Sequence, residues 1–362
     1  MFRKAEWRSF ALAFGHSRAH PADDTRLKHK AATMITRRTS LTLLLSAAIG
    51  LMTSQPRPAI ADEFPSRMMH IVVPGASGTP PDIISRMIAK ELAQAEGWTI
   101  IVENKPGAMQ TVGATDVLKL PADGYTILAA SLPAALAPSL LQSVNVRLDK
   151  DFTPVIKLAT AYHVLVVNPS VPVTTLPELV ALLRKQPDKL NFSSGGFGTP
   201  AHVTGELFKL QTGIRATHVP YQALPQAIGD LLNGTNQFQF ITPLPVLDLI
   251  AAGKLRALAV AAPIRSGVLK DVPTVGEAGF PDLISQDWIG LLVRRGTPDD
   301  VVQRLNEAAN RVLMKPELRS AIARLGAEAV GGSSNEFSEF LASQMVYWAK
   351  VVRDSGMTMH PL

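Results

Sequence analysis

The sequence has no cysteine among its 362 residues. This absence excludes disulfide bonds, thiolate metal ligands and a cysteine nucleophile. It leaves an oxidising compartment open, where stability then has to come from packing. Charged residues are also scarce, at 18%, whereas hydrophobic residues reach 46%. That apolar share can build a core and excludes a disordered chain, and the length predicts about two domains.

Excess positive charge is missing from most of the chain, although the net charge is +6. Residues 1–61 hold ten of the 36 Lys and Arg residues and three of the 30 acids, so residues 62–362 carry 26 basic and 27 acidic residues, a balance of −1. A nucleic-acid-binding protein carries a basic patch in its folded part. No dense Lys/Arg cluster occurs beyond residue 61, so DNA and RNA are excluded as partners.

Residues 34–61 have the pattern of an export signal. The basic pair Arg37-Arg38 precedes an apolar run, Leu41–Met52, and the small-x-small sequence Ala59-Ile60-Ala61 follows. As a helix the apolar run spans about 18 Å, too short for a membrane core of about 30 Å. The segment therefore predicts a cleaved signal and not a membrane anchor.

The arginine pair resembles a twin-arginine signal, which directs the export of folded proteins, with the general secretory route as the alternative. Residues 1–33 have the character of an over-long start, with Met34 as the initiator. The predicted mature chain is 62–362.

Apolar, β-rich runs alternate with helical patterns along the mature chain, which predicts an α/β fold of βαβ units with a largely parallel sheet. The predicted strands cover Met68–Pro74, Thr99–Glu103, Tyr125–Ala130, Val164–Asn168, Leu190–Ser194, Ala216–Pro220, Gln237–Ile241 and Leu255–Ala261. The predicted helices cover Asp82–Glu96, Gln110–Leu120, Leu176–Lys185, a segment after Thr199, Gln226–Asn233, Pro298–Met314, Pro316–Leu325 and Ser334–Ser355. The last helices need a sheet to cover, so we expect the chain to return to the first domain near Trp288. The result is two α/β lobes with a cleft between them.

Two glycine-rich loops, Pro74–Asp82 and Ser193–Pro200, each follow a predicted strand and lead into a helix. Ligands of α/β sheets sit beyond the carboxyl ends of strands. Glycine lets backbone N–H groups approach a ligand, and a helix N-terminus favours an anion. Ordinary tight turns are the alternative for either loop alone, but one such loop in each lobe favours an anion site between the lobes.

Motifs of catalysis and cofactor binding are absent from the sequence. It contains no G-x-S-x-G elbow, no phosphate-binding P-loop and no H-E-x-x-H. Gly196-Phe197-Gly198 loosely matches a dinucleotide fingerprint, but the next strand ends at Tyr221 without the acid that a ribose requires. His202, one turn into the second-loop helix, either faces the cleft or has a packing or capping role. Trp288 and Trp348 are expected in the core.

Short motifs, in order and spacing over nearly all of 62–362, are similar to the Bug-type extracytoplasmic solute receptors of tripartite tricarboxylate transporters. They are Ile71–Pro74 with Gly78 and Asp82, Val102–Ala108, Ala122–Thr126, Val166–Pro169, Ser194–His202, His218–Tyr221, Ala252–Val260 and Asp271–Gly279. The resemblance implies a two-lobe periplasmic binding protein of the Venus-flytrap type. It implies a receptor without enzymatic activity, cofactor or metal that closes around a small carboxylate and passes it to a membrane permease.

The resemblance also implies the site. Lobe 1 is expected to comprise 62–162 plus 286–362, and lobe 2 163–285, in a monomer. In the family, backbone N–H groups of the two loops and ordered waters hold the ligand carboxylate. The expected ligand-binding residues are Ser77, Gly78, Thr79, Asp82, Ser131, Tyr162, Ser194, Gly196, Gly198, Thr199, His202, Tyr221 and Gln237.

The first loop departs from the family pattern, since Pro80 and Pro81 follow Thr79. Proline has no backbone N–H, so fewer donors remain for a ligand. Many members have Asp where Gln237 stands, and a neutral Gln cannot balance a ligand ammonium. This disfavours an amino acid and favours a di- or tricarboxylate or an aromatic acid. Two other classes stay open: a periplasmic enzyme with His202 or His163 as base, which lacks a complete catalytic set, and a sensor that contacts a signalling partner in place of a permease.

Overall fold

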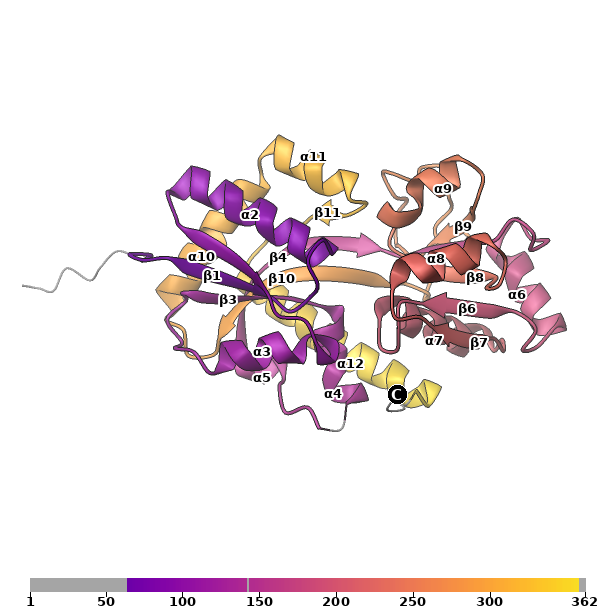
Figure 1. Ribbon diagram of the computed structural model, residues 1–362, viewed down its shortest axis with the longest axis horizontal. Coiled ribbons are helices and arrows are strands. Elements are labelled where there is room, and N and C mark those ends of the chain that lie inside the picture. Colours follow the sequence, from indigo (N-terminus) through magenta and orange to yellow (C-terminus); the bar gives the residue numbers. More distant parts are fainter. Residues whose placement is uncertain (1–63, 142, 358–362) are drawn as a thin grey trace, which may run out of the picture. The chain divides into compact units, whose positions relative to one another are not determined.

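The computed structural model describes residues 64–141 and 143–357. The chain divides into two units, Met1–Ala61 and Asp62–Leu362, and all described residues belong to the second. The predicted export signal and the over-long start lie outside the described residues. The described part contains a six-stranded sheet, ordered β11-β4-β10-β3-β1-β2, and a five-stranded sheet, ordered β7-β6-β8-β5-β9 (Figure 1). We call the first sheet with its helices lobe 1 and the second with its helices lobe 2.

Lobe 1 is built from both ends of the described chain. Its strands are β1 (Met69–Val73), β2 (Ile100–Asn104), β3 (Thr126–Ser131), β4 (Phe152–Tyr162), β10 (Gln286–Arg294) and β11 (Glu328–Ala329). Helices α2 (Pro80–Glu96), α10 (Asp299–Leu313) and α11 (Pro316–Arg324) cover one face. The other face carries α3 (Thr111–Leu118), α4 (Leu132–Leu140), α5 (Leu148–Asp151) and α12 (Ser334–Ser355). A short turn of helix, η1 (Ala108–Gln110), precedes α3.

Lobe 2 is formed by the middle of the chain. Its strands are β5 (Val164–Val167), β6 (Asn191–Ser194), β7 (Thr217–Pro220), β8 (Phe238–Ile241) and β9 (Arg256–Val260). One face of the sheet packs on α6 (Leu176–Lys185) and α7 (Pro200–Thr212). The other packs on α8 (Leu224–Leu232), η2 (Leu244–Val246) and α9 (Leu247–Ala251).

The prediction of a largely parallel sheet was wrong, because both sheets are mixed. In lobe 1, β1 pairs in parallel with β2 and β3, but β10 runs antiparallel to β3 and β4, and β11 runs antiparallel to β4. In lobe 2, β5 runs antiparallel to β8 and β9. The antiparallel strands β4, β5 and β10 are those in which the chain passes between the lobes.

The two crossings between the lobes lie against each other. Only His163 separates β4 from β5, and Ser285 immediately precedes β10. The backbone N–H of His163 donates to the carbonyl of Ser285 (3.1 Å), and the N–H of Ser285 donates to the carbonyl of Ala261 (3.0 Å). The N–H of Ala261 in turn donates to the carbonyl of His163 (2.7 Å). These bonds join the crossings into one connection.

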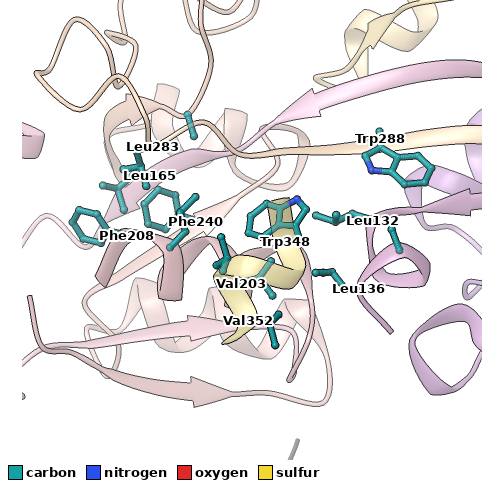
Figure 2. Close-up of a cluster of buried hydrophobic side chains, with 14 of the residues drawn as sticks. Leu132, Leu136, Leu165, Val203, Phe208, Phe240, Leu283, Trp288, Trp348 and Val352 are labelled. Carbon is teal, nitrogen blue, oxygen red and sulfur yellow. The ribbon is translucent and has the colours of Figure 1, made fainter. Parts of the chain in front are cut away.

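Helix α12 carries the hydrophobic core from lobe 1 into lobe 2. It begins at a capping box, in which Ser333 accepts from the N–H of Glu336, and it ends at left-handed Gly356. The helix contacts α4 of lobe 1 and α7 of lobe 2. Figure 2 shows Trp348 between Leu132 of α4 and Val203 of α7, and all three side chains are buried. As expected from the sequence, Trp348 is a core residue.

Candidate functional site

A cavity of about 310 Å³ lies between the two lobes. Lobe 1 contributes the loop before α2, the end of β3 and the adjoining ends of β4 and β10. Lobe 2 contributes the loop before α7, the start of α8 and the end of β8. Strands β1, β3, β6 and β8 all deliver their carboxyl ends to this space, as expected for a ligand site in an α/β fold.

The two glycine-rich loops build the same turn, once in each lobe. Thr79 Oγ1 donates to the carbonyl of Ala76, and Thr199 Oγ1 donates to the carbonyl of Gly196, each at 2.7 Å. Each threonine is the N-cap residue of a helix, and proline follows it. Each is preceded by a left-handed glycine, Gly78 (φ 80°) or Gly198 (φ 69°), a conformation that glycine adopts without strain.

In both turns the N–H of this glycine donates to the side chain four residues on. Gly78 donates to Asp82 Oδ2 (2.9 Å), and Gly198 donates to His202 Nδ1 (3.1 Å). Despite burial, hydrogen bonds from Arg86, Gly78 and Asn104 hold the pKa of Asp82 below its ordinary value. Burial lowers the pKa of His202 to about 4, so the imidazole is neutral at pH 7 and accepts this bond. Asp82 and His202 therefore shape the turns and do not line the cavity.

The turns differ in the N–H groups that they offer. The first-turn N–H groups of a helix have no helical partner and are available to a ligand. In α2 the first two positions are Pro80 and Pro81, so neither donates. In α7 only the first position is proline, and Ala201, which lines the cavity, keeps its N–H. The helix of lobe 2 is therefore the better anion-binding end.

Both loop threonines line the cavity, but their hydroxyl protons point back into the turns. Thr199 is one of the expected ligand-binding residues, but this geometry does not support its hydroxyl as a donor to the ligand. Ser131 offers a donor instead. It lines the cavity, and its Oγ accepts a bond from Gln110 Nε2 (2.6 Å), which leaves the hydroxyl proton free for a ligand.

Gln110 also lines the cavity and is a residue that the sequence reasoning missed. Its Oε1 accepts from the backbone N–H of Ser131 (3.0 Å). The backbone reaches this position through three successive left-handed residues, Ala108 (φ 42°), Met109 (φ 53°) and Gln110 (φ 72°). Each costs of the order of 1–2 kcal/mol for a residue other than glycine, and such strain concentrates at functional sites. No periodicity in the sequence signals it.

The other expected site residues lie behind the wall of the cavity. Ser77, Gly78 and Asp82 belong to the first turn, whereas Ser194, Gly196, Gly198 and His202 belong to the second. Tyr162 lines a second, smaller cavity of about 220 Å³, and the hydroxyl of Tyr221 bonds Asp230 and Asn236. Gln237 accepts from the N–H of Asn191 and donates to the carbonyl of Gly234. Both ends of its amide are occupied away from the cavity, so the structure does not support Gln237 as the residue that sorts ligands.

The part of the chain that the structure describes places no cationic side chain in the lining of the cavity. Among the described residues that form it, Asp287 and His163 are the titratable ones, and none is Lys or Arg. Burial lowers the pKa of His163 to about 4, and its Nδ1 lies 3.0 Å from Ser285 Oγ. Burial raises the pKa of Asp287 to about 6. An anion in this cavity therefore depends on N–H groups, hydroxyls and the dipole of α7.

Apolar side chains form much of the remaining wall, and they include Pro80, Pro81, Ile84, Leu224 and Ile241. Trp288 borders the cavity as well, but its ring is fully buried against Phe337 and Phe340, as expected for a core residue. Within residues 64–141 and 143–357, no group of three or more His, Asp or Glu side chains is placed to hold a metal ion. No helix in that part of the chain is long and apolar enough to span a bilayer.

Comparison with known proteins identifies the family. The model of the tripartite tricarboxylate transporter family receptor matches residues 84–357. BugT of Bordetella pertussis is 32% identical over 301 residues, which are 83% of this chain and 92% of BugT. The chain therefore belongs to the tripartite tricarboxylate transporter receptor family, as the Bug-type motifs predict.

Solved structures agree in sequence and fold. R. palustris Rpa4515, solved with adipate, is 31% identical with a TM-score of 0.73, over 82% of this chain and 99% of that one. MatC (Rpa3494) from Rhodopseudomonas palustris, solved with bound malate, is 31% identical with a TM-score of 0.70, over 80% and 100%. The fold is the two-lobe fold of periplasmic binding proteins, and the prediction of that fold class is confirmed.

Proposed function

We propose that this receptor binds a small carboxylate in the cavity between its lobes and delivers it to the membrane permease of a tripartite tricarboxylate transporter. The observation that carries the proposal is a cavity whose described lining residues include no Lys or Arg and do include Ala201, an N–H donor in the first turn of α7. Helix N-termini bind anions without a formal positive charge. The relatives solved with adipate and malate support the same ligand class.

The ligand carboxylate is assigned to the first turn of α7. The N–H group of Ala201 donates to it, and the Ser131 hydroxyl, oriented by Gln110, approaches it from lobe 1. Pro80, Pro81 and Ile84 give the cavity an apolar side that suits a hydrocarbon skeleton. The thirteen residues expected from the sequence thus reduce to Thr79, Ser131 and Thr199 at the surface of the cavity, with most of the others behind it.

Binding closes the two lobes around the ligand. Lobe 1 comprises 62–162 plus 286–362 and lobe 2 comprises 163–285, and the connection at His163 and Ser285 is the hinge. The protein acts as a periplasmic monomer, exported by the twin-arginine route and cleaved after Ala61. It acts as a solute receptor and not as an enzyme, in keeping with the transporter receptor family to which the chain belongs.

A single substitution tests the proposed anchor. Ala201→Pro removes the N–H that borders the cavity, and it gives the second turn the Thr-Pro-Pro sequence that the first turn already accommodates at residues 79–81. The fold should therefore be retained. Loss of one hydrogen bond to a charged group costs about 1.5–3 kcal/mol, or roughly ten- to a hundredfold in affinity.

The measurement first identifies the co-purified ligand by native mass spectrometry and then compares affinities by calorimetry. Pro81→Ala is the matched control, because it restores the missing N–H in lobe 1. We expect it to keep or improve affinity. Equal affinity of Ala201→Pro and the wild type would remove the α7 N-terminus from the site.

A further inference from the structure

Asp287 is the ionisable side chain of the cavity that is left available to a ligand. Its Oδ1 accepts from the backbone N–H groups of Trp288 (2.9 Å) and Leu132 (3.3 Å). Among the described residues no donor reaches its Oδ2. The residue lines the cavity and keeps part of its surface accessible there. The Oδ2 of Asp287 is therefore a free hydrogen-bond acceptor in the same cavity that attracts an anion at the start of α7.

A second polar group in the same wall also lacks a partner. Thr160 is 4% exposed and borders the cavity, and its Oγ1 makes no hydrogen bond. Thr160 on β4 pairs with Trp288 on β10, next to Asp287, which pairs with Ala161. Buried polar groups are normally hydrogen-bonded, and an unpaired one is costly. Successive residues of a strand point to opposite faces of the sheet, so the pairing places the Thr160 side chain on the face opposite Asp287. The Thr160 Oγ1 is also buried, so of the two side chains only Asp287 presents an open acceptor on the lobe 1 wall, in the opposite lobe from the start of α7.

We propose that Asp287 selects the ligand by accepting a hydrogen bond from a hydroxyl or an amino group on the part of the ligand that lies against lobe 1. The inference rests on the proposed function and makes it narrower. A second carboxylate at this place meets the like charge of Asp287 in a site without a compensating cation. The preferred ligand is therefore a hydroxy- or amino-substituted monocarboxylate, which reverses the preference for a di- or tricarboxylate inferred from Gln237.

Asp287 has a competing structural role, because its bond to Leu132 caps the first turn of α4. Asp287→Asn separates the two roles, since the amide oxygen still accepts from both N–H groups while the charge is lost. Thr160→Val is a neighbouring control, because it keeps the shape and removes a hydroxyl that is buried beneath the wall. Glu328→Gln is the matched control, because Glu328 lines the second cavity and not this one.

The ligands for the test are two sets of acids that differ only in the terminal group. One set is butyrate, 4-hydroxybutyrate, 4-aminobutyrate and glutarate, and the other is benzoate, 4-hydroxybenzoate, 4-aminobenzoate and terephthalate. Calorimetry compares the wild type and the three variants at pH 8, because burial raises the pKa of Asp287 to about 6 and its carboxylate is ionised at pH 8. Comparison of the hydroxy acids with the amino acids in these sets shows whether the ligand donates from a hydroxyl or from an amino group.

In the set that binds better, we expect the wild type to bind a donor-bearing acid about ten- to a hundredfold tighter than the dicarboxylate. Asp287→Asn should lose most of this ratio, whereas Thr160→Val and Glu328→Gln should lose none of it. A dicarboxylate that binds tightest, with a ratio unchanged in Asp287→Asn, would reduce Asp287 to a helix cap and overturn the inference. Binding of none of the eight acids would instead contradict the carboxylate receptor itself, and the inference with it.

Discussion

Gly198 offers a test of lobe closure with a built-in control, because Gly78 holds the equivalent place in the other turn. Alanine at either position is forced into the left-handed region, which costs about 1–2 kcal/mol. The added methyl group at Gly78 would meet nothing within 4 Å, whereas at Gly198 it would lie 2.6 Å from Cε and 2.8 Å from Sδ of Met109. Met109 belongs to lobe 1 and Gly198 to lobe 2, so the methyl group separates the lobes where they meet.

The two substitutions should therefore differ in affinity more than in stability. Moving Met109 off its rotamer costs about 0.5–1.5 kcal/mol, which corresponds to roughly a two- to tenfold weaker binding of the ligand. The Met109 cost arises only when the lobes are closed, so it lowers the affinity of Gly198→Ala. The left-handed strain is present in both variants and lowers their stability. Gly78→Ala should change affinity little, while both variants lower the unfolding free energy by similar amounts.

The assay is calorimetry with the co-purified ligand on both glycine variants, together with urea unfolding of the unliganded proteins. The double variant Gly198→Ala, Met109→Ala supplies the decisive measurement. Its affinity should return to that of Met109→Ala alone, because the shortened side chain makes room for the methyl group. Two results would show that contact between these loops does not limit closure. One is that Gly78→Ala weakens binding as much as Gly198→Ala, and the other is that adding Met109→Ala to Gly198→Ala does not restore the affinity.

Two further predictions concern pH and export. Because burial raises the folded-state pKa of Asp287 from 3.8 to about 6, the folded protein binds this proton more tightly, and stability is lost as the pH rises from about 4 to 6. Burial lowers the pKa of His163 to about 4, so this residue adds stability as the pH rises over the same range, and the contribution cancels because the wild type and Asp287→Asn share it. In urea unfolding, Asp287→Asn should match the wild type near pH 4 and exceed it at pH 8, by at most about 3 kcal/mol; a constant difference between the two would rule out the raised pKa. Replacing Arg37 and Arg38 by lysine should leave the precursor in the cytoplasm, as measured by cell fractionation, and efficient export of that variant would favour the general secretory route.

The sequence predicts helices and turns correctly where residues close together in the chain stabilise them. The predicted bounds of α6 and α12 match the observed ones, because Thr175 with Glu178 and Ser333 with Glu336 form capping boxes. The two glycine-rich loops were also found at the cavity, because glycine and proline mark such turns directly.

Long-range pairing explains what the sequence could not supply. Strands β4 and β10 were missed, although they pair with each other from Phe152↔Arg294 to Tyr162↔Gln286. Pro154 and Lys157 interrupt the apolar pattern of β4, and the pairing register shifts between Leu291 and Leu292, where the sheet accommodates Pro154. Asp287 was missed for the same reason, since it faces the cavity only because β10 lies beside β4.

The turns before α2 and α7 differ, and three features meet at α7: the N–H of Ala201, the crossing between the lobes and the packing against α12. Its first turn supplies the N–H of Ala201, whereas the corresponding turn of α2 carries Pro81. One turn further, Thr204 Oγ1 donates to the carbonyl of Pro200 (2.7 Å) and adjoins Ser285 Oγ at the crossing between the lobes. The same helix packs against α12, which extends from lobe 1. An anion bound at the start of α7 therefore contacts a helix that is linked to the hinge and to α12. An anion at the start of α2 would contact a helix that belongs to lobe 1 alone.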